Sequence, residues 1–204
     1  MLDFWELPFN VRPDLTPYIV HLTKRNDGLS AFKNLVNILE TGTLNGSGRK
    51  GYVKGPNRAV CFMDIPFSAL KYVINDKNSK GPKVRYEPCG IFLTKKWAYE
   101  NGLRPVLYLS DDEIIDLRIP KNETWRVVKF EKRNQGWISW VHEREWRGKG
   151  DLELPTNVGV LVRSSHQVKR LYKLLNNPKR TFFCKPRAIL PLSIVCQGLK
   201  YLSK

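Results

Sequence analysis

The sequence predicts an α+β fold in which short strands form mainly antiparallel or mixed sheets and the helices lie at the periphery. About seven short stretches have the length and apolar content of strands, and the few helical stretches do not alternate with them regularly. The chain also has neither G-x-G-x-x-G nor G-x-x-x-x-G-K-[ST], so a doubly wound fold with a glycine-rich phosphate loop is disfavoured.

The elements are predicted from the spacing of apolar residues. Strands are expected at residues 18–23, 59–63, 90–94, 105–109, 125–130, 158–163 and 187–195. Helices are expected after Ser30, after Asp64, around 95–101 and over 165–176. In the last of these, the core-facing side chains are expected to be Val168, Leu171, Tyr172 and Leu175. The first helix has the clearest signals, because Ser30 is a favoured N-cap, apolar residues follow at i, i+3, i+4 and i+7, and Gly42 ends it.

Length and composition indicate an ordinary globular protein. The chain has 204 residues, 42% hydrophobic and 26% charged, which fits a single domain with a basic C-terminal portion over 154–204. No signal peptide and no bilayer-spanning run are recognised, so we expect a cytoplasmic protein without membrane contact. Four cysteines lack zinc-ligand spacing and are expected to be free thiols.

The charge is large and unevenly distributed. Thirty-five Lys and Arg stand against 19 Asp and Glu, giving a formal net charge of +16, and no acidic residue follows Glu153. A second acid-free stretch lies between Glu40 and Asp64. Such a balance indicates a polyanionic partner, RNA or DNA, although basic residues that only confer solubility are the alternative. The expected nucleic-acid-binding residues are Arg49, Lys50, Lys54, Lys169, Arg170 and Lys173.

Two acidic residues stand close together in this basic chain, in His142-Glu143-Arg144-Glu145-Trp146-Arg147. If residues 140–147 form a strand, Glu143 and Glu145 share one face and Arg144 lies on the other. Carboxylates beside Arg and Trp bind a ribose, stabilise a cationic transition state or hold a metal. The alternative is a pair of surface salt bridges with neighbouring arginines.

A second pair of candidates lies at the end of the first strand. On a strand, His21 and Thr23 point the same way just before a turn. They are either hydrogen-bonding groups at the edge of a cleft or a histidine and a threonine satisfied within a partly buried strand.

These motifs together resemble a family. Val20-His21-Leu22-Thr23 with the helix that ends in Ile38-Leu39-Glu40-Thr41-Gly42, the block from Val60 to Leu70, and Glu143-Arg144-Glu145-Trp146-Arg147 follow the order of the histidine-type ADP-ribosyltransferase-like proteins. The combination is also similar to the AbiGi-type abortive-infection proteins and to phage-defence toxins that ADP-ribosylate nucleic acid. The resemblance covers roughly residues 18–150.

The resemblance implies an ADP-ribosyltransferase that uses NAD as a substrate and needs no metal. It implies that Glu145 is catalytic and that Glu143 assists by orienting the acceptor or taking its proton. The implied NAD-binding residues are His21, Thr23, Arg58, Phe62, Phe67 and Tyr72, the three aromatic residues being alternatives for packing on nicotinamide. A bacterial toxin or antiphage effector acting on RNA or DNA, with a cognate antitoxin as a further partner, would follow.

Two other functions stay open at this point. In a metal-dependent nuclease, Glu143, Glu145 and one residue of the acidic group Asp111 to Asp116 would bind magnesium. In a non-catalytic nucleic-acid-binding module, the two glutamates would only form salt bridges.

Overall fold

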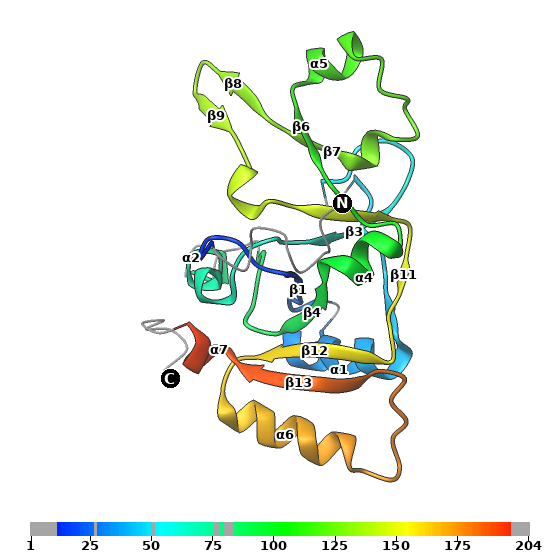
Figure 1. Cartoon of the computed structure of the whole chain (residues 1–204), viewed down its shortest axis with the longest axis vertical. Helices are drawn as coiled ribbons and strands as arrows, with labels where there is room; N and C mark the ends of the chain where they lie inside the picture. The colour runs from blue at the N-terminus through cyan, green and yellow to red at the C-terminus, as the bar shows by residue number, and fades with distance from the viewer. Residues whose placement is uncertain (1–11, 27, 50–51, 76–77, 80–83, 197–204) are drawn as a thin grey trace.

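A computed structural model describes residues 12–26, 28–49, 52–75, 78–79 and 84–196 (Figure 1). Its helices are α1 (Ala31–Thr41), α2 (Leu70–Val73), α4 (Lys95–Glu100), α5 (Asp111–Asp116), α6 (Ser165–Leu175) and α7 (Leu192–Val195). Single 3-10 turns are η4 (Phe67–Ala69), η5 (Thr124–Arg126) and η6 (Val141–Glu143). The expected α+β class is confirmed.

The strands are short and belong to several small sheets. They are β1 (Tyr18–Leu22), β2 (Thr43–Leu44), β3 (Ala59–Phe62), β4 (Gly90–Thr94), β5 (Arg104–Pro105), β6 (Leu107–Leu109), β7 (Val127–Lys129), β8 (Glu131–Arg133), β9 (Gly136–Ile138), β10 (Trp146–Lys149), β11 (Leu152–Glu153), β12 (Asn157–Val162) and β13 (Lys185–Pro191). The largest sheet has the order β1-β4-β12-β13 and is mixed, because only β12 and β13 are parallel.

A second sheet carries the acidic motif. It has the order β3-β10-β5, and both pairs are antiparallel. A bridge between Val20 and Met63 joins it to the edge of the first sheet, so that β1 and β3 lie side by side. Above these sheets in Figure 1, α5, the β6-β7 pair and the β8-β9 hairpin form a separate projection, while α6 lies at the opposite end beyond β13.

Apolar burial explains why the two sheets hold together. One cluster of buried side chains joins α1, β3, β4, β10 and β12 and includes Leu35, Phe62 and Ile91. A second cluster lies around β1, η4, α2 and α7 and includes Val20 and Leu70. Burying such side chains is worth about 1.5–3 kcal/mol each, and this burial fixes β1 against β3.

Helix α1 has the ends that the sequence predicts. Ser30 accepts a hydrogen bond from the backbone N–H of Lys33 at 3.3 Å, and Gly42 adopts a left-handed conformation with φ of 71°. The Gly42 N–H donates to the Ile38 carbonyl, which closes the last turn. The predicted strands at 18–23, 59–63, 90–94 and 158–163 are also confirmed within one or two residues.

Four expectations were wrong in detail. Residues 140–147 are not one strand, because η6 and a left-handed Arg144 precede β10. Residues 192–195 form α7, where a strand was expected, and residues 124–126 form η5 before β7. On α6, Leu171 is fully buried, whereas Tyr172 is 53% exposed where a core side chain was expected. The helix turns Tyr172 outward together with Lys169 and Lys173.

The cysteines Cys61, Cys89, Cys184 and Cys196 are free thiols in the structure. Of the helices in the described ranges, none combines the length and the apolar content that crossing a membrane requires.

Candidate active site

The two glutamates lie on either side of a tight turn at Arg144, which leads from η6 to β10. Arg144 separates them and has φ of 44°, a left-handed conformation that costs a non-glycine residue on the order of 1 kcal/mol. The Arg144 guanidinium holds the turn through its Nε–H, which donates to the Asp64 carbonyl at 2.7 Å, and through a second bond to the Asp14 carbonyl. The Asp64 N–H in turn donates to the Glu143 carbonyl at 3.1 Å. The turn therefore fixes both carboxylates relative to the end of β3.

Tyr108 on β6 fixes the other side of this turn. Its hydroxyl accepts a hydrogen bond from the Glu145 N–H at 3.0 Å and donates to the Trp140 carbonyl at 3.4 Å. Because one hydroxyl joins the residues before and after η6, the backbone of Glu145 is held from outside its own segment.

Glu145 is paired with Arg147 in the interior of the protein. Arg147 donates through Nε to Oε1 of Glu145 at 2.8 Å and through a terminal nitrogen to Oε2 at 3.3 Å. Glu145 and Arg147 are 8% and 3% exposed. Arg147 also donates to the carbonyls of Trp125 and Val127, at 2.8 and 3.3 Å. The guanidinium is thus held on three sides, and it presents a fixed partner to Glu145.

Cys61 completes the same face of the β3-β10 pair. It lies opposite Arg147 in the register, so both side chains project to one side, while Phe62 and Trp146 form the next pair on the other side. Burial, the charge of Glu145 and a hydrogen bond to that carboxylate raise the pKa of the Cys61 thiol. Burial alone would lower the pKa of Arg147, but Cys61 and Glu145 raise it, and the guanidinium stays charged.

His21 on β1 contacts the backbone of Cys61. Its Nδ1 lies 2.8 Å from the Cys61 carbonyl oxygen, and burial lowers the pKa of the ring, so His21 is neutral at pH 7. A carbonyl can only accept, so Nδ1 carries the proton and Nε2 has the free lone pair. Within the described residues Nε2 has no hydrogen-bond partner. Cys61 therefore contacts both residues, His21 through its backbone carbonyl and Glu145 through its thiol.

Glu143 has a different environment. It is 6% exposed, and the Tyr86 hydroxyl donates to its Oε1 at 2.6 Å. Burial raises the pKa of Glu143, the Tyr86 bond opposes that rise, and the charge of Glu145 adds to it. Burial and the Glu143 charge raise the pKa of Tyr86, which therefore remains a proton donor. The exposed His142 lies beside this carboxylate, with Nε2 3.9 Å from Oε1.

A cation and an aromatic ring cover the outer side of this pair. The Arg85 guanidinium lies 3.9 Å from the centre of the Trp140 ring, which is itself 6.0 Å from the His142 ring. Arg85 and Tyr86 are neighbours, so the segment that supplies the Glu143 hydrogen bond is held against the residues that precede η6.

The other residues expected to bind NAD lie in varied surroundings. The Thr23 hydroxyl is buried and can donate to either the Ala31 or the Cys89 carbonyl, at 2.9 and 3.0 Å, which ties the end of β1 to α1 and β4. Phe62 is 1% exposed in the core, and Tyr72 is 73% exposed. Phe67 stacks on Tyr18, with ring centres 5.5 Å apart. Arg58 is exposed and forms an ion pair with Asp151 at 3.1 Å.

The basic residues expected to contact nucleic acid fall into three groups. Lys54 is engaged by Asp111, which also pairs with Lys129, and these two lysines lower the pKa of Asp111 to about 2. Arg49 is exposed and Lys50 lies outside the described residues. Lys169, Arg170 and Lys173 are exposed on α6, at the far end of the molecule from α5 (Figure 1).

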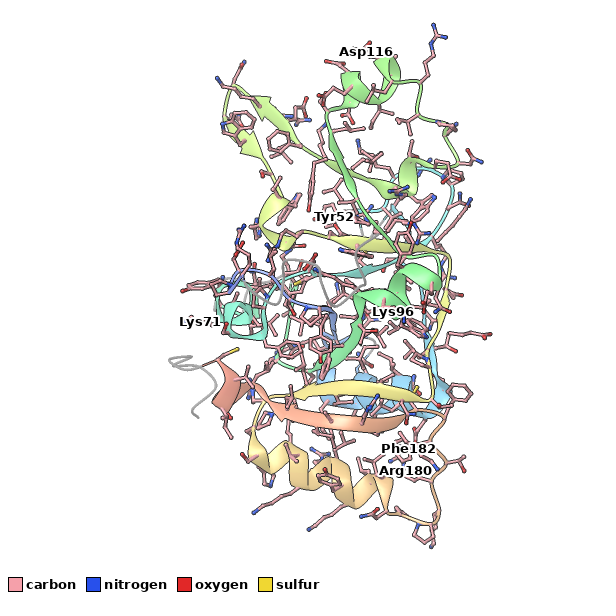
Figure 2. The ribbon with its side chains drawn as sticks, viewed as in Figure 1. Tyr52, Lys71, Lys96, Asp116, Arg180 and Phe182 are labelled. Carbon is pink, nitrogen blue, oxygen red and sulfur yellow. The ribbon has the colours of Figure 1, made fainter. Side chains whose placement is uncertain are left out.

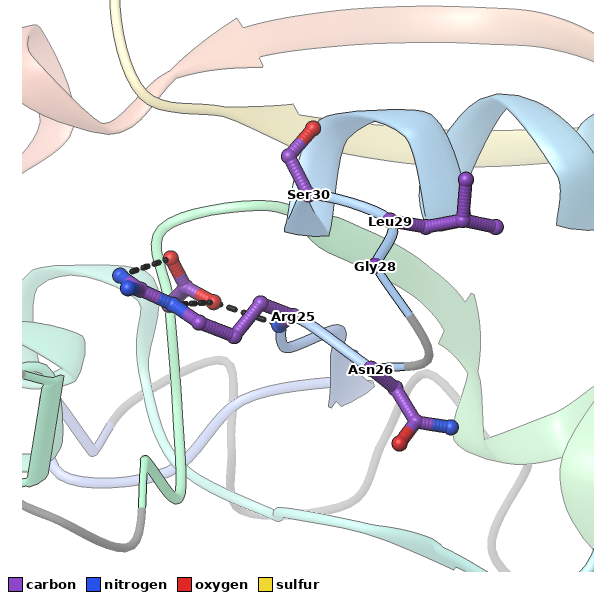
Figure 3. Close-up of a pocket in the computed structure, with 6 residues that line it drawn as sticks. Arg25, Asn26, Gly28, Leu29 and Ser30 are labelled. Carbon is purple, nitrogen blue, oxygen red and sulfur yellow. Dashed lines mark hydrogen bonds and ion pairs between the residues drawn. The ribbon is translucent and has the colours of Figure 1, made fainter.

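A pocket lies at the N-terminal end of α1. Its lining residues are Arg25, Asn26, Gly28, Leu29, Ser30 and Glu87. Arg25 and Glu87 form an ion pair in this lining, with the Arg25 terminal nitrogen 3.0 Å from Oε1 of Glu87, and Figure 3 shows Arg25 on the segment that leads to Ser30. Glu87 follows Tyr86 directly, so adjacent residues of one segment line the pocket and bond to the Glu143 carboxylate.

A third carboxylate does not join the pair in the part of the chain that the structure describes. No group of three or more His, Cys, Asp or Glu side chains there could hold a metal ion. Asp111, which the nuclease alternative would use, is bound by Lys54 and Lys129 on the projection.

Sequence reasoning missed three groups that define the site. Tyr86 and Tyr108 lie 57 and 37 residues from their partners, and Cys61 was only a buried strand residue in the sequence. The alternation of β3 and the antiparallel register would have found Cys61, but no local pattern marks either tyrosine.

Comparison with known proteins gives a limited result. No protein-family model matches the chain, and no curated protein matches it. Solved structures with a similar arrangement include Thermus sp. 2.9 DarT in complex with NAD+, with a TM-score of 0.48 and 13% identity, and the same protein in complex with carba-NAD+, with 0.46 and 15%. Each comparison covers 89% of this chain and 98% of that chain. At these values the likeness assigns no role to any residue here.

Proposed function

We propose that the chain is an NAD-dependent ADP-ribosyltransferase that modifies nucleic acid, acting in the cytoplasm as a toxin or antiphage effector. The observation that carries the proposal is the buried pair of carboxylates, Glu143 and Glu145, placed in different environments. A neutral His21 is joined to Glu145 through Cys61, which contacts both. The net charge of +16 supports a polyanionic acceptor. A cognate antitoxin would accompany such a toxin.

Glu145 is suited to the cationic stage of the reaction. When the bond between nicotinamide and ribose breaks, positive charge develops on the ribose, and a preorganised carboxylate stabilises it. Arg147 binds one lone pair on each oxygen of Glu145, and the Cys61 thiol bonds to the same carboxylate, which leaves one acceptor site for a ribose hydroxyl. Arg147 thus orients the catalytic carboxylate and is itself a positioning residue.

Glu143 is suited to take a proton from the acceptor. Its raised pKa makes it a better base than an ordinary surface glutamate, and Tyr86 holds only one of its oxygens. In the transfer step, an acceptor nitrogen or oxygen bonds to the anomeric carbon of the ribose as nicotinamide leaves, and the acceptor proton passes to Glu143. Two carboxylates whose environments differ in this way can take different roles, Glu143 as the base and Glu145 as the group that stabilises positive charge.

His21 and the remaining predicted residues would serve NAD. The free Nε2 of His21 accepts a hydrogen bond, which fits a ribose hydroxyl or the nicotinamide amide. Thr23 would act through its two carbonyl contacts by fixing the end of β1. Arg58 on the pyrophosphate, and Phe67 or Tyr72 on nicotinamide, stay parts of the proposal. Phe62 does not, because it is 1% exposed within the core and has no free ring face to offer.

The test uses purified protein with labelled NAD and, in separate reactions, DNA, RNA and a protein extract. We expect label on nucleic acid in the presence of EDTA, and loss of that label in Glu145→Gln. Glu153→Gln, which changes an exposed glutamate on β11, is the matched control and should behave as wild type. If NAD stays intact and no acceptor is labelled, the proposal is wrong. Acceptor cleavage that requires magnesium would instead establish the nuclease.

A further inference from the structure

Helix α6 presents a continuous cationic face to solvent. Leu171 is fully buried, and Val168 and Leu175 pack against the core. The outer face carries Lys169, Arg170 and Lys173, with Tyr172 among them at 53% exposure. Residues three and four apart lie on the same side of a helix, so the three cations and the tyrosine form one surface, here called the α6 face.

Acidic residues do not neutralise the α6 face. In the described ranges, Lys169, Arg170 and Lys173 form no ion pair, whereas Lys54, Lys129 and Lys149 each pair with a carboxylate. No acidic residue occurs after Glu153, and the exposed Lys185 and Arg187 on β13 add further charge. Figure 2 shows that Arg180 and Phe182 lie at this end of the molecule, opposite Asp116 on α5. The acidic helix α5 therefore lies at the opposite end from the α6 face, and Glu40 pairs with Arg180 and not with the α6 cations.

Two contacts join α6 to segments that follow the pocket-lining Ser30 and Glu87 in the chain. The Arg170 guanidinium lies 5.0 Å from the centre of the Phe32 ring, in the first turn of α1. Gln167 on the inner side of α6 accepts a hydrogen bond from the Cys89 thiol at 3.5 Å. Ser30, the N-cap of α1, lines the pocket (Figure 3), as does Glu87, and the neighbouring Tyr86 contacts Glu143.

We propose that the α6 face binds the sugar-phosphate backbone of a single-stranded nucleic acid, with Tyr172 stacking on a base. Spaced cations follow a phosphate backbone without reading its sequence, and an exposed aromatic ring accepts any base. The α6 face is a docking surface separate from Glu143 and Glu145, and an acceptor long enough to reach both would bind more tightly than a short one. This inference rests on the proposed function only for the identity of the acceptor.

Binding is measured by fluorescence anisotropy with 20-nucleotide single-stranded DNA and RNA, without NAD. We expect Lys169→Gln/Arg170→Gln/Lys173→Gln to weaken binding at least about tenfold at low salt and to reduce the slope of log affinity against log salt by about 2. The matched control is Lys24→Gln/Lys96→Gln/Lys121→Gln, which removes three exposed cations from other surfaces and should retain most of the affinity. Tyr172→Ala should weaken binding about tenfold with an unchanged salt slope.

Several outcomes would overturn the inference. Equal losses of affinity in the two triple variants would mean that only net charge matters. An unchanged affinity in the α6 variant would show that the α6 face does not bind nucleic acid. Binding of the α6 face to vesicles of phosphatidylcholine and phosphatidylglycerol, without an effect on nucleic acid, would assign it to lipid. Because the assay contains no NAD, loss of binding in the α6 variant would support the surface even if no ADP-ribose were ever transferred.

Discussion

Glu143 and Glu145 are two residues apart, yet they lie in different chemical environments. Glu145 is bound through both oxygens by the buried guanidinium of Arg147, whereas Glu143 accepts one bond from the neutral hydroxyl of Tyr86. Burial raises the pKa of Glu143, whose partner is neutral, whereas the partner of Glu145 carries a full positive charge. One turn thus gives two identical side chains different properties, and the proposed division of labour follows from that difference.

The largest effect is expected when the charged partner is removed. Arg147→Met leaves Glu145 buried without a counter-charge, which should lower the free energy of unfolding by about 3–5 kcal/mol. Lys149→Met, two residues along the same strand, removes an exposed ion pair with Glu123 and should cost only about 0–1 kcal/mol. Urea unfolding followed by circular dichroism measures both. Equal costs would show that the Glu145 pair is not buried as described.

The next effect concerns the carboxylate with the neutral partner. Glu143→Gln removes the proposed base but keeps an oxygen that can accept from Tyr86. Transfer to nucleic acid should fall by about 10²–10⁴-fold, the usual contribution of a general base, while nicotinamide release to water falls much less. Chromatographic assay of nicotinamide and of labelled oligonucleotide separates the two rates. An equal loss of both would assign Glu143 to bond cleavage instead.

A smaller effect is expected from Tyr86 itself. Its hydrogen bond favours the ionised form of Glu143 and lowers that pKa, so Tyr86→Phe should raise the pKa further. The decline of transfer on the acidic side should then begin at a higher pH, and the rate in that range should fall about tenfold. A pH profile of transfer tests this, and a uniform loss at all pH values would indicate a purely structural role.

The smallest effect is expected at the residue between the two glutamates. Arg144→Gly relieves the left-handed backbone strain but loses the bonds to the Asp64 and Asp14 carbonyls, whereas Arg144→Ala loses the bonds and keeps the strain. Glycine should therefore be more stable than alanine by about 1 kcal/mol at this position. Thermal unfolding of the two variants measures the difference, and the reverse order would contradict the left-handed turn.

The elements that local patterns could predict are those whose ends and faces are set by their own residues. The cap at Ser30, the left-handed Gly42 and the apolar face of α1 are examples, and all three are found. The strand expected over 140–147 fails because Arg144, with no glycine to signal it, is held left-handed by carbonyls from distant segments. Local propensity cannot anticipate a conformation that tertiary contacts impose.

The candidate site shows the same limit. The sequence pointed to Glu143, Glu145 and His21, and the structure places these three around Cys61 and the end of β3. A salt bridge between the glutamates and a neighbouring arginine was expected at the surface, whereas the Glu145–Arg147 pair is buried. Tyr86 and Tyr108 could not be predicted, because each acts on a residue that only the folded chain brings near.

The division of roles is tested most directly by nicotinamide release from NAD in the absence of any acceptor. Glu145→Gln keeps the shape of the side chain, and Arg147 keeps its bonds to the Trp125 and Val127 carbonyls, so near-ultraviolet circular dichroism can first establish that the variant is folded. We predict that folded Glu145→Gln releases nicotinamide about 10²–10³-fold more slowly than wild type, while Glu143→Gln retains most of the rate. Release at the wild-type rate by folded Glu145→Gln would contradict the assignment.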